Sequence, residues 1–511
     1  MKLLTSVLAL AQLCSGEHAR FSVQGTDAQA LVQRAMPYAE VLPKMELAGN
    51  GDLIRADDSD SVEVIVELSD KLNKQAIQSQ LSLLGLESQL EEISRPFSQI
   101  QAERQEHAAP VEGYHSPLML LREFQKLEVN YQGKAAQAKL HSVQEEFDVP
   151  KTIQGNEVLY LRVFAPKKNA APKHNVVVVS NHHSRELVTP EIILDTATRL
   201  LEDYIDGKQW ATLTLDHQDI YFIWTLNPDG LNEVWSSNNM HRKNMRSNSD
   251  GSLGVDLNRN YHVGWDATCA GSTVPRSETY RGTSALSEVE TQGMVKLQQH
   301  LRPVKVLDFH SYAREVRINY GTCIKLPGPI DNMHWTLAGL MADSIRDYRS
   351  ARSCCLGGNI HQAYHDHGAL SFLVETATAF QPPSDLMREE VRRLRKGTEG
   401  YLSLPPTFRG RLVSKSGDIP DDVTVKISVA ECDEADCQKF DWPMQEAVGG
   451  VTKDGAVHVW LDFDKQVELE FDVCRDSKCV STIVEMHTAG HADLLTWDDR
   501  QVYEIRVPES N

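Results

Sequence analysis

The sequence predicts an α/β domain with a mostly parallel, mixed central sheet flanked by helices, followed by a small C-terminal all-β sandwich. Over residues 113–405, apolar strand-like runs alternate with helical segments, which is typical of parallel strands that are connected through helices. Over residues 406–511, short β-branched runs follow one another with turns between them, which is typical of an antiparallel sandwich.

The expected strands of the α/β region are short apolar runs at 176–179, 220–226, 304–309 and 370–374. The first run is continuously apolar, as expected for a strand that is buried on both faces. Helices are expected to begin at Thr189-Pro190 and at Ser287, which would form a capping box with Glu290, and a third is expected over 335–348. The sandwich strands are expected at 423–429, 456–462, 467–473 and 502–507.

The first 16 residues are predicted to be a signal peptide. Lys2 supplies a positive charge, residues 3–13 form an apolar run, and the small residues Ser15 and Gly16 follow. The run is too short to span a bilayer, and no later stretch approaches that length. We therefore expect export, to the extracellular space or the lumen of the secretory pathway. A buried N-terminal helix is the alternative.

Residues 17–112 form a separate region in front of the α/β domain. They contain one strand-like run, at 62–68, and an amphipathic stretch with helical spacing at 71–105. No chemistry is evident in this region.

Composition limits the partners that the protein can have. The net charge of −20 argues against nucleic acids and anionic membranes. Of nine cysteines, Cys14 lies in the expected signal peptide, and the even number that remains favours disulfides after export. Two C-x₄-C pairs lie in the strand-rich C-terminal region without grouped histidines, so disulfides are favoured there over a metal site. We expect a monomer.

A metal site is predicted from His183 and Glu186, which directly follow the first expected strand. The His-x-x-Glu spacing can place an imidazole and a carboxylate on one face of a turn, within reach of one ion. Catalytic zinc sites typically have three protein ligands, and two histidines with one glutamate are one such set. His310, at the end of the strand at 304–309, is the best candidate for the third ligand.

The position of these residues supports a common site. His183, the loop at 227–230, His310 and Glu375 all lie at the carboxyl ends of expected strands. In open α/β sheets, ligands bind at that end of the strands.

The ordered motifs of residues 113–405 resemble those of the zinc metallocarboxypeptidases of the carboxypeptidase A/B type, the M14 peptidase family. The matching runs are His-Ser-Arg-Glu at 183–186, Asn-Pro-Asp-Gly at 227–230, His-Arg-Lys-Asn at 241–244, Gly-Val-Asp-Leu-Asn-Arg-Asn-Tyr at 254–261, Ser-Glu-Thr-Tyr-Arg-Gly at 277–282, Ser-Glu-Val-Glu-Thr at 287–291, Phe-His-Ser-Tyr at 309–312 and Phe-Leu-Val-Glu-Thr at 372–376. The resemblance covers somewhat over half of the chain.

The resemblance implies a zinc site with catalytic groups around it. His183, Glu186 and His310 would bind one Zn²⁺ per chain. Glu375 would act as general base on the metal-bound water, and Arg242 would stabilise the developing oxyanion. These residue types suit the chemistry, because zinc acidifies bound water and a nearby carboxylate can move its proton to the leaving amine.

The resemblance also implies residues that bind substrate. Asn258 and Arg259 would hold the C-terminal carboxylate of a peptide, for which a planar guanidinium is well shaped. Arg185 would lie in a neighbouring subsite, and Asp256 would orient His183 from behind. Ile360 would lie at the floor of the pocket for the departing side chain.

One position departs from the family pattern. The family usually carries a mobile tyrosine a few residues before the Gly-Gly at 357–358, and the corresponding residue here is Ser353. Tyr348 and Tyr364 flank it out of register. The altered loop could also shift Ile360 out of the pocket, in which case His361 or another residue would line it.

These observations predict a secreted zinc carboxypeptidase that hydrolyses the C-terminal bond of peptides or proteins and prefers apolar C-terminal residues. The alternatives are a hydrolase of the same fold that acts on another amide, and a binding protein that has lost catalysis. Residues 17–112 have the size of an inhibitory pro-segment, and a permanent accessory domain is the alternative. The sandwich at 406–511 resembles the accessory β-domains of some family members, and we expect it to act in folding or docking with two disulfides.

Overall fold

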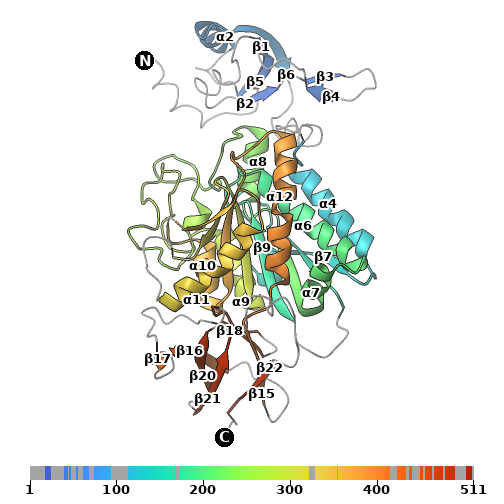
Figure 1. The fold of residues 1–511 in the computed structure, drawn as a ribbon. Coiled ribbons are helices and arrows are strands. Elements are labelled where there is room, and N and C mark those ends of the chain that lie inside the picture. The colour runs from blue at the N-terminus through green and yellow to red at the C-terminus, as the bar shows by residue number, and fades with distance from the viewer. Residues whose placement is uncertain are drawn as a thin grey trace. The chain divides into compact units, whose positions relative to one another are not determined.

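The fold is described from a computed structural model of the chain (Figure 1). The described residues are 18–24, 40–43, 45–47, 53–55, 61–67, 74–93, 113–166, 173–320, 328–353, 355–414, 423–432, 437–439, 449–452, 455–462, 465–475, 478–488 and 502–508. The expected signal peptide lies outside these ranges. The chain divides into two compact units, residues 1–119 with 232–241, and residues 120–231 with 242–511.

The N-terminal unit contains a four-stranded sheet and a helix. The strand order is β2 (Glu40–Pro43), β5 (Ser61–Glu67), β1 (His18–Gln24) and β6 (Glu87–Ile93), with antiparallel pairing throughout. Helix α2 (Lys74–Leu83) precedes β6, and a separate hairpin joins β3 (Met45–Leu47) and β4 (Leu53–Arg55). The strand predicted at 62–68 is confirmed as β5. The helical prediction for 71–105 is wrong over 87–93, where β6 forms.

The second unit is built on an eight-stranded mixed sheet. Its strand order is β13 (Arg349–Arg352), β12 (Glu315–Ile318), β14 (Leu370–Thr376), β11 (Lys305–Ser311), β9 (His174–Ser180), β10 (Gln218–Ile223), β8 (Leu159–Phe164) and β7 (Gln137–Ser142). The four central strands, β14, β11, β9 and β10, are parallel, whereas β12 and β8 pair with them antiparallel. The predicted α/β class with a mostly parallel, mixed sheet is therefore confirmed.

Helices connect and cover these strands. They are α4 (Pro117–Tyr131), α5 (Val143–Phe147), α6 (Val188–Ile205), α7 (Gln209–His217), α8 (Pro228–Ser236), α9 (Val289–Leu301), α10 (Gly328–Asp343), α11 (Asn359–His367) and α12 (Ser384–Ser403), with a short 3₁₀ turn η1 (Leu257–Arg259). Val177 and Val179 pack in one apolar cluster with Met294 and Leu297 of α9 and Ala363 of α11. Because side chains alternate along a strand, the opposite face of β9 is the one available to α6, which contacts the strand.

Two helix starts differ from the sequence prediction. The N-cap of α6 is Leu187, without a side-chain cap, and the hydroxyl of Thr189 donates instead to the carbonyl of Glu186. The N-cap of α9 is Glu288, and the hydroxyl of Ser287 donates to its carboxylate. Both predicted caps are wrong, because Thr189 already lies inside α6 and Ser287 lies one residue before the N-cap of α9. The predicted strand at 220–226 ends at residue 223, and α10 lies about seven residues before its predicted start.

The C-terminal region is a sandwich of two four-stranded sheets, as predicted. One contains β18 (Gly449–Val451), β19 (Ala456–Val459), β15 (Phe408–Val413) and β22 (Val502–Arg506), and the other β17 (Cys437–Lys439), β16 (Thr424–Cys432), β20 (Gln466–Arg475) and β21 (Lys478–His487). Both sheets contribute to one core, in which the rings of Phe408 and Phe471 stack 5.1 Å apart. Unlike the predicted antiparallel pattern, β15 and β22 pair in parallel.

Disulfides are confirmed in part. Cys474 and Cys479 form one across the β20–β21 hairpin, and Cys269 is also disulfide-bonded. Cys432 and Cys437 are opposite each other in the register of β16 and β17, and the predicted second disulfide of the sandwich stays a prediction.

The sandwich contacts the amino ends of the parallel strands. The indole of Trp460 donates to the carbonyl of Val304, which directly precedes β11. The ring of His458 meets that of His174, the first residue of β9, edge to face. In the part of the chain that the structure describes, no helix is long and apolar enough to cross a membrane.

Candidate active site

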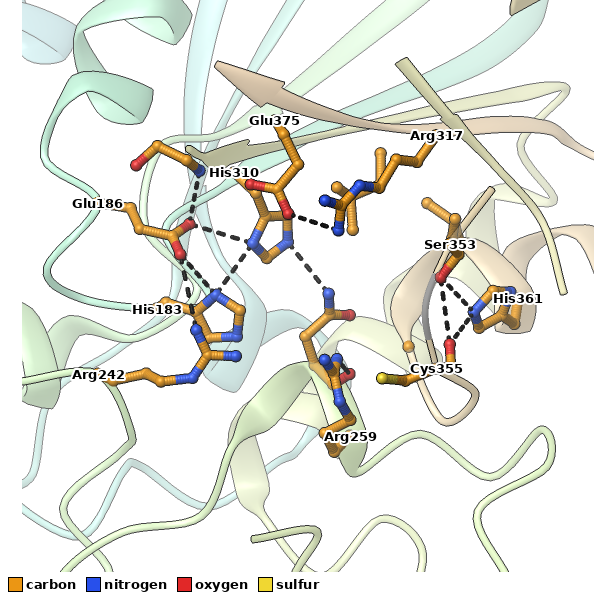
Figure 2. A pocket seen from close by; sticks show the side chains of 15 residues that line it. His183, Glu186, Arg242, Arg259, His310, Arg317, Ser353, Cys355, His361 and Glu375 are labelled. Atoms are coloured by element: carbon orange, nitrogen blue, oxygen red, sulfur yellow. Dashed lines mark hydrogen bonds and ion pairs between the residues drawn. The ribbon is translucent and has the colours of Figure 1, made fainter. Parts of the chain in front are cut away.

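The predicted metal ligands meet at the carboxyl ends of the central strands. His183 follows the end of β9 by three residues, and His310 is the penultimate residue of the neighbouring strand β11. Glu186 follows on the turn after His183, where its backbone amide donates to the carbonyl of His183. Glu375, on β14, is the parallel register partner of His310. The β9–β11–β14 order therefore brings the predicted ligands and the predicted base to one place (Figure 2).

The three ligand side chains face one another at short range. His183 Nδ1 lies 2.8 Å from Glu186 Oε1, and His310 Nδ1 lies 3.1 Å from both His183 Nδ1 and Glu186 Oε2. The backbone amide of Ser311 donates to Glu186 Oε2 and fixes that carboxylate. Two imidazole nitrogens that point at each other beside a buried carboxylate form a donor set that suits a cation. This His₂Glu set fits zinc, for which it is a known catalytic ligand set.

A second group of possible ligands shares His310. His182, Asp308 and His310 are also close enough to hold an ion. However, His182 Nε2 is hydrogen-bonded to the hydroxyl of Tyr261, and neither His182 nor Asp308 lines the pocket. The group that contains His183 and Glu186 is therefore the one that a substrate can reach. His182 is therefore a neighbour of the site.

Carboxylates behind the histidines fix the orientation of both rings. Asp256 Oδ1 lies 3.0 Å from His183 Nε2, and its Oδ2 accepts from Arg242 at 2.8 Å. Asp308 Oδ1 lies 3.2 Å from His310 Nε2. Such contacts are the rule for metal-binding histidines, because they set the tautomer and the ring orientation. The position of Asp256 agrees with its predicted role, whereas the sequence reasoning missed Asp308.

The pKa values of the two glutamates of the site are shifted in opposite directions. Burial raises the pKa of Glu186, but the charges and hydrogen bonds of His183 and His310 outweigh it and hold the pKa below that of an ordinary carboxyl. Burial, reinforced by the charge of Glu186, raises the pKa of Glu375, and Arg317 opposes this only in part. A carboxylate shifted upward is better matched to proton transfer near neutral pH.

Most of the predicted residues line a single pocket. Its void, including space open to solvent, is about 450 Å³. The predicted residues in its lining are His183, Glu186, Arg242, Asn258, Arg259, His310, Ile360 and Glu375. Their roles remain predictions, but the structure brings them together from segments almost 200 residues apart in the sequence.

The predicted substrate-binding residues differ in how they are held. The amide of Asn258 points at His310 Nε2 at 3.2 Å, and its oxygen accepts from the backbone amide of Asn359. Arg259 donates to the carbonyl of Asn258 from the pocket wall. Arg185 is not in the pocket lining; its guanidinium lies 4.2 Å over the ring of Phe380 and 3.3 Å from Glu278. Its predicted subsite therefore lies outside the main pocket.

The pocket also contains His361, which was predicted as an alternative to Ile360, Ser353 from the position that departs from the family pattern, and five residues that were not predicted. Its further lining residues are Ser311, Arg317, Ser353, Cys355, Gly358, His361 and Leu373. Ser353 donates to the carbonyl of Cys355 and takes the place where the family pattern has tyrosine. Neither flanking tyrosine substitutes for it, because Tyr348 donates to Glu390 and the ring of Tyr364 packs against His334. Arg317 lies on β12, where the alternation of charged and apolar residues over only four positions is a weak sequence signal for a strand.

Fold and site together define a zinc metallopeptidase architecture, and comparison with known proteins gives the family. The family model described as zinc carboxypeptidase matches residues 134–389, half of the chain. The chain therefore belongs to the M14 zinc carboxypeptidase family.

Relatives of known description are metallocarboxypeptidases that are called inactive. The chain is 30% identical over 208 residues to "Inactive metallocarboxypeptidase ECM14" of Paracoccidioides lutzii, covering 39% of this chain and 35% of that protein. A protein of the same description from Arthroderma otae is 29% identical over 225 residues, covering 41% and 37%. The chain thus spans about a third of the length of these relatives.

Solved structures match over a longer stretch. Thrombin activatable fibrinolysis inhibitor aligns with a TM-score of 0.51 and 18% identity, covering 76% of this chain and 98% of that one. Carboxypeptidase A from Helicoverpa armigera aligns with a TM-score of 0.50 and 20% identity, covering 76% and 97%. At this identity, the likeness supports the fold alone.

Proposed function

We propose that this protein is an active zinc carboxypeptidase that removes single residues from the C-terminus of peptides. The observation that carries the proposal is Glu375, a carboxylate that faces the His183–Glu186–His310 ligand set inside one pocket. A metal-binding protein without catalysis has no need for this base. The same pocket contains Arg242 and Arg259, which together suit an oxyanion and a terminal carboxylate.

Each residue of the pocket would have a separate role in the reaction. When bound, zinc would acidify the attacking water and polarise the scissile carbonyl. Glu375 would take the proton of that water and deliver it to the leaving amine. Arg242, held by Asp256, would stabilise the oxyanion by about 2.7–4 kcal/mol, if it acts like an oxyanion-hole donor. Arg259 would hold the carboxylate of the substrate, so only a free C-terminus would be positioned for cleavage.

The pocket for the departing side chain supports a preference against basic residues. Ile360 is 1% exposed and lines the pocket together with Leu373. A lysine or arginine side chain would meet these apolar groups without a partner for its charge, at a cost of several kcal/mol. We therefore propose that apolar C-terminal residues are released faster than basic ones.

Two regions outside the catalytic part complete the proposal. Residues 17–112 would act as a pro-segment that limits activity until it is removed, and residues 1–16 as a signal for export. The disulfide between Cys474 and Cys479 supports an oxidising compartment. Cleavage at residues 105–115 should raise activity, whereas an intact chain already at full rate would contradict a pro-segment role.

A second candidate function is a zinc-binding protein without catalysis, which the relatives described as inactive favour. The two candidates are separated by measuring zinc content together with release of the last residue from a blocked dipeptide, before and after proteolysis at 105–115. An active enzyme should release the residue in proportion to bound zinc and should not act on the dipeptide amide. Stoichiometric zinc without release, before and after proteolysis, would favour the second candidate.

A further inference from the structure

Arg317 places a third arginine in the active-site pocket. It lies on β12, the strand next to β14, and is the antiparallel register partner of Leu373. Its side chain is 22% exposed, and Nη1 lies 3.1 Å from Glu375 Oε1. Figure 2 shows the guanidinium between Glu375 on one side and Ser353 with His361 on the other, away from His183 and Glu186. Arg317 thus reaches the part of the pocket beyond the metal ligands.

In the proposed reaction, no anionic group of the substrate is assigned to Arg317. The pocket lining contains three arginines, Arg242, Arg259 and Arg317, and two carboxylates, Glu186 and Glu375. In the proposed reaction, the oxyanion uses Arg242 and the terminal carboxylate uses Arg259. Carboxylates outside the lining also contact two of these arginines, Asp256 at Arg242 and Glu315 at Arg317. Arg317 is therefore the arginine of the lining to which the proposed reaction assigns no group of the substrate.

Two carboxylates contact Arg317, those of Glu315 and Glu375. Glu315 contacts Arg317 at 2.9 Å, but its other oxygen is already paired with Arg349 at 2.5 Å. Glu375 must face the attacking water to act as a base, so its contact with Arg317 has to be exchangeable. A carboxylate from the substrate could therefore take a place beside the guanidinium, and bidentate pairing would favour it.

We propose that Arg317 makes the pocket selective for an acidic residue, glutamate or aspartate, at the C-terminus of the substrate. This inference rests on the proposed carboxypeptidase function. The methylenes of the side chain would lie along Ile360 and Leu373, and its carboxylate would pair with Arg317. An apolar side chain would offer the guanidinium no hydrogen bond, and a basic side chain would be repelled by its charge. The expected order of release is acidic, then apolar, then basic.

The alternative for Arg317 is a positioning role, in which it only holds Glu375. The two roles differ in what a substitution changes. A positioning residue acts on every substrate equally, whereas a specificity residue changes the ratio between substrates. Arg349→Leu is a matched control, because it removes an arginine from the same Glu315 but its side chain is 77% exposed and lies outside the pocket.

The test compares kcat/KM for blocked dipeptides that end in Glu, Leu and Lys, with the zinc-loaded, proteolytically activated protein and its Arg317→Leu, Arg317→Lys and Arg349→Leu variants. Arg317→Leu should lower the Glu-to-Leu ratio on the order of 100-fold, Arg317→Lys should keep part of it, and Arg349→Leu should keep all of it. A parent protein that prefers Leu, or an Arg317→Leu variant that is slower on all substrates with an unchanged ratio, would overturn the proposal.

A binding measurement distinguishes a failure of this inference from a failure of the proposed function. Calorimetry on the same zinc-loaded proteins compares 2-benzylsuccinate with butane-1,2,4-tricarboxylate, which carries an acidic arm in place of the phenyl ring. The tricarboxylate should bind more tightly to the parent, and Arg317→Leu should reverse that order. Absence of all dipeptide hydrolysis would remove the proposed function alone. Equal or weaker binding of the tricarboxylate to the parent would remove the acidic selectivity alone.

Discussion

Buried charges lie at both ends of the parallel strands, but their surroundings differ. At the amino end of β11, Lys305 is fully buried and its ammonium donates to the backbone carbonyls of Tyr401, Leu402 and Leu404 at 2.7–2.9 Å. Burial lowers the pKa of this ammonium well below its ordinary value, and the three carbonyls are its fixed partners within the chain. At the carboxyl end of the same strand, His310 faces the nitrogen of another histidine and a carboxylate across a pocket.

This difference separates a structural charge from a functional one. Fixed backbone partners satisfy Lys305 and tie the end of α12 to the sheet, so its contribution belongs to stability. At the carboxyl end, the nitrogens of two histidines face each other, and the group lines a pocket. A bound cation would satisfy these nitrogens. Substitutions at the carboxyl end should therefore lower zinc content or kcat, whereas a substitution at Lys305 should lower the free energy of unfolding.

The largest effect is expected from the metal ligands. His310→Ala should remove bound zinc and all measurable peptidase activity, because it removes one of three protein ligands. His183→Ala and Glu186→Ala should act in the same way. The readout is metal content by atomic spectroscopy beside thermal melting. His300→Ala, which replaces an exposed histidine outside the site, serves as control. Full zinc occupancy in His310→Ala would contradict the ligand assignment.

Loss of the base should separate binding from turnover. Glu375→Gln should keep stoichiometric zinc and lower kcat on the order of 10²–10⁴-fold, the usual contribution of a general base. The amide has nearly the same shape and can still accept from Arg317, so the fold should be unaffected. Single-turnover kinetics measure the rate of cleavage, and a metal assay on the same sample measures the zinc content. A variant with unchanged kcat would remove Glu375 from this role.

At the amino end of β11, a substitution should change stability and leave zinc binding and turnover unchanged. Lys305→Met should lower the free energy of unfolding by about 2–4 kcal/mol, because the carbonyls of Tyr401 and Leu404 lose a donor. The carbonyl of Leu402 keeps a second donor, Gln218. Zinc content and kcat of the folded fraction should be unchanged. Denaturant unfolding gives the first quantity, and a variant as stable as the parent would break the comparison between the two ends.

Asp308 should have an intermediate effect, because it acts on the metal through His310. Asp308→Asn should weaken zinc binding roughly 10–100-fold, as outer partners of zinc histidines usually do. A competition titration with a zinc chelator measures the affinity. Asp343→Asn, at the end of α10, is a control for the loss of one acidic charge. Equal zinc affinity in the parent and Asp308→Asn would show that the ring of His310 is oriented without this carboxylate.

The smallest effect is expected from Ile360. Ile360→Ala should lower kcat/KM for dipeptides that end in Leu or Phe by about 10-fold, the size expected for lost apolar contact with a substrate. Dipeptides that end in Lys should gain nothing, since Arg317 remains. If the variant and the parent share the same profile across Leu, Phe and Lys, then Ile360 is a packing residue and does not touch the departing side chain.

Much of the site could be predicted because its residues lie in compact local motifs. His183 and Glu186 are three residues apart on one turn, and His310 and Glu375 end strands whose apolar character is plain in the sequence. The parallel order of the strands then brings them together by a general rule of α/β sheets. The same holds for Asp256, which lies two residues before Asn258.

Residues that depend on tertiary contacts were missed. Arg317 lies on β12, an edge-side strand of only four residues with two charged members, which has no strong apolar signal. Asp308, by contrast, lies two residues before His310 on β11, so both side chains point to the same face of the sheet, and the strand period could have indicated this pair. The predicted helix caps failed because α6 and α9 begin within two residues of the predicted positions but not at them, and local patterns do not fix the end of a helix to the residue.

The most direct test of the central claim follows one peptide by mass spectrometry. The zinc-loaded protein, with residues up to about 112 removed, is incubated with a peptide that ends in glutamate and with its C-terminally amidated twin. Loss of one glutamate residue from the free peptide, none from the amidated twin, and no loss from either with Glu375→Gln is the predicted result. Internal cleavage, equal attack on both peptides, or no loss from the free peptide would contradict a zinc carboxypeptidase that requires a free C-terminus.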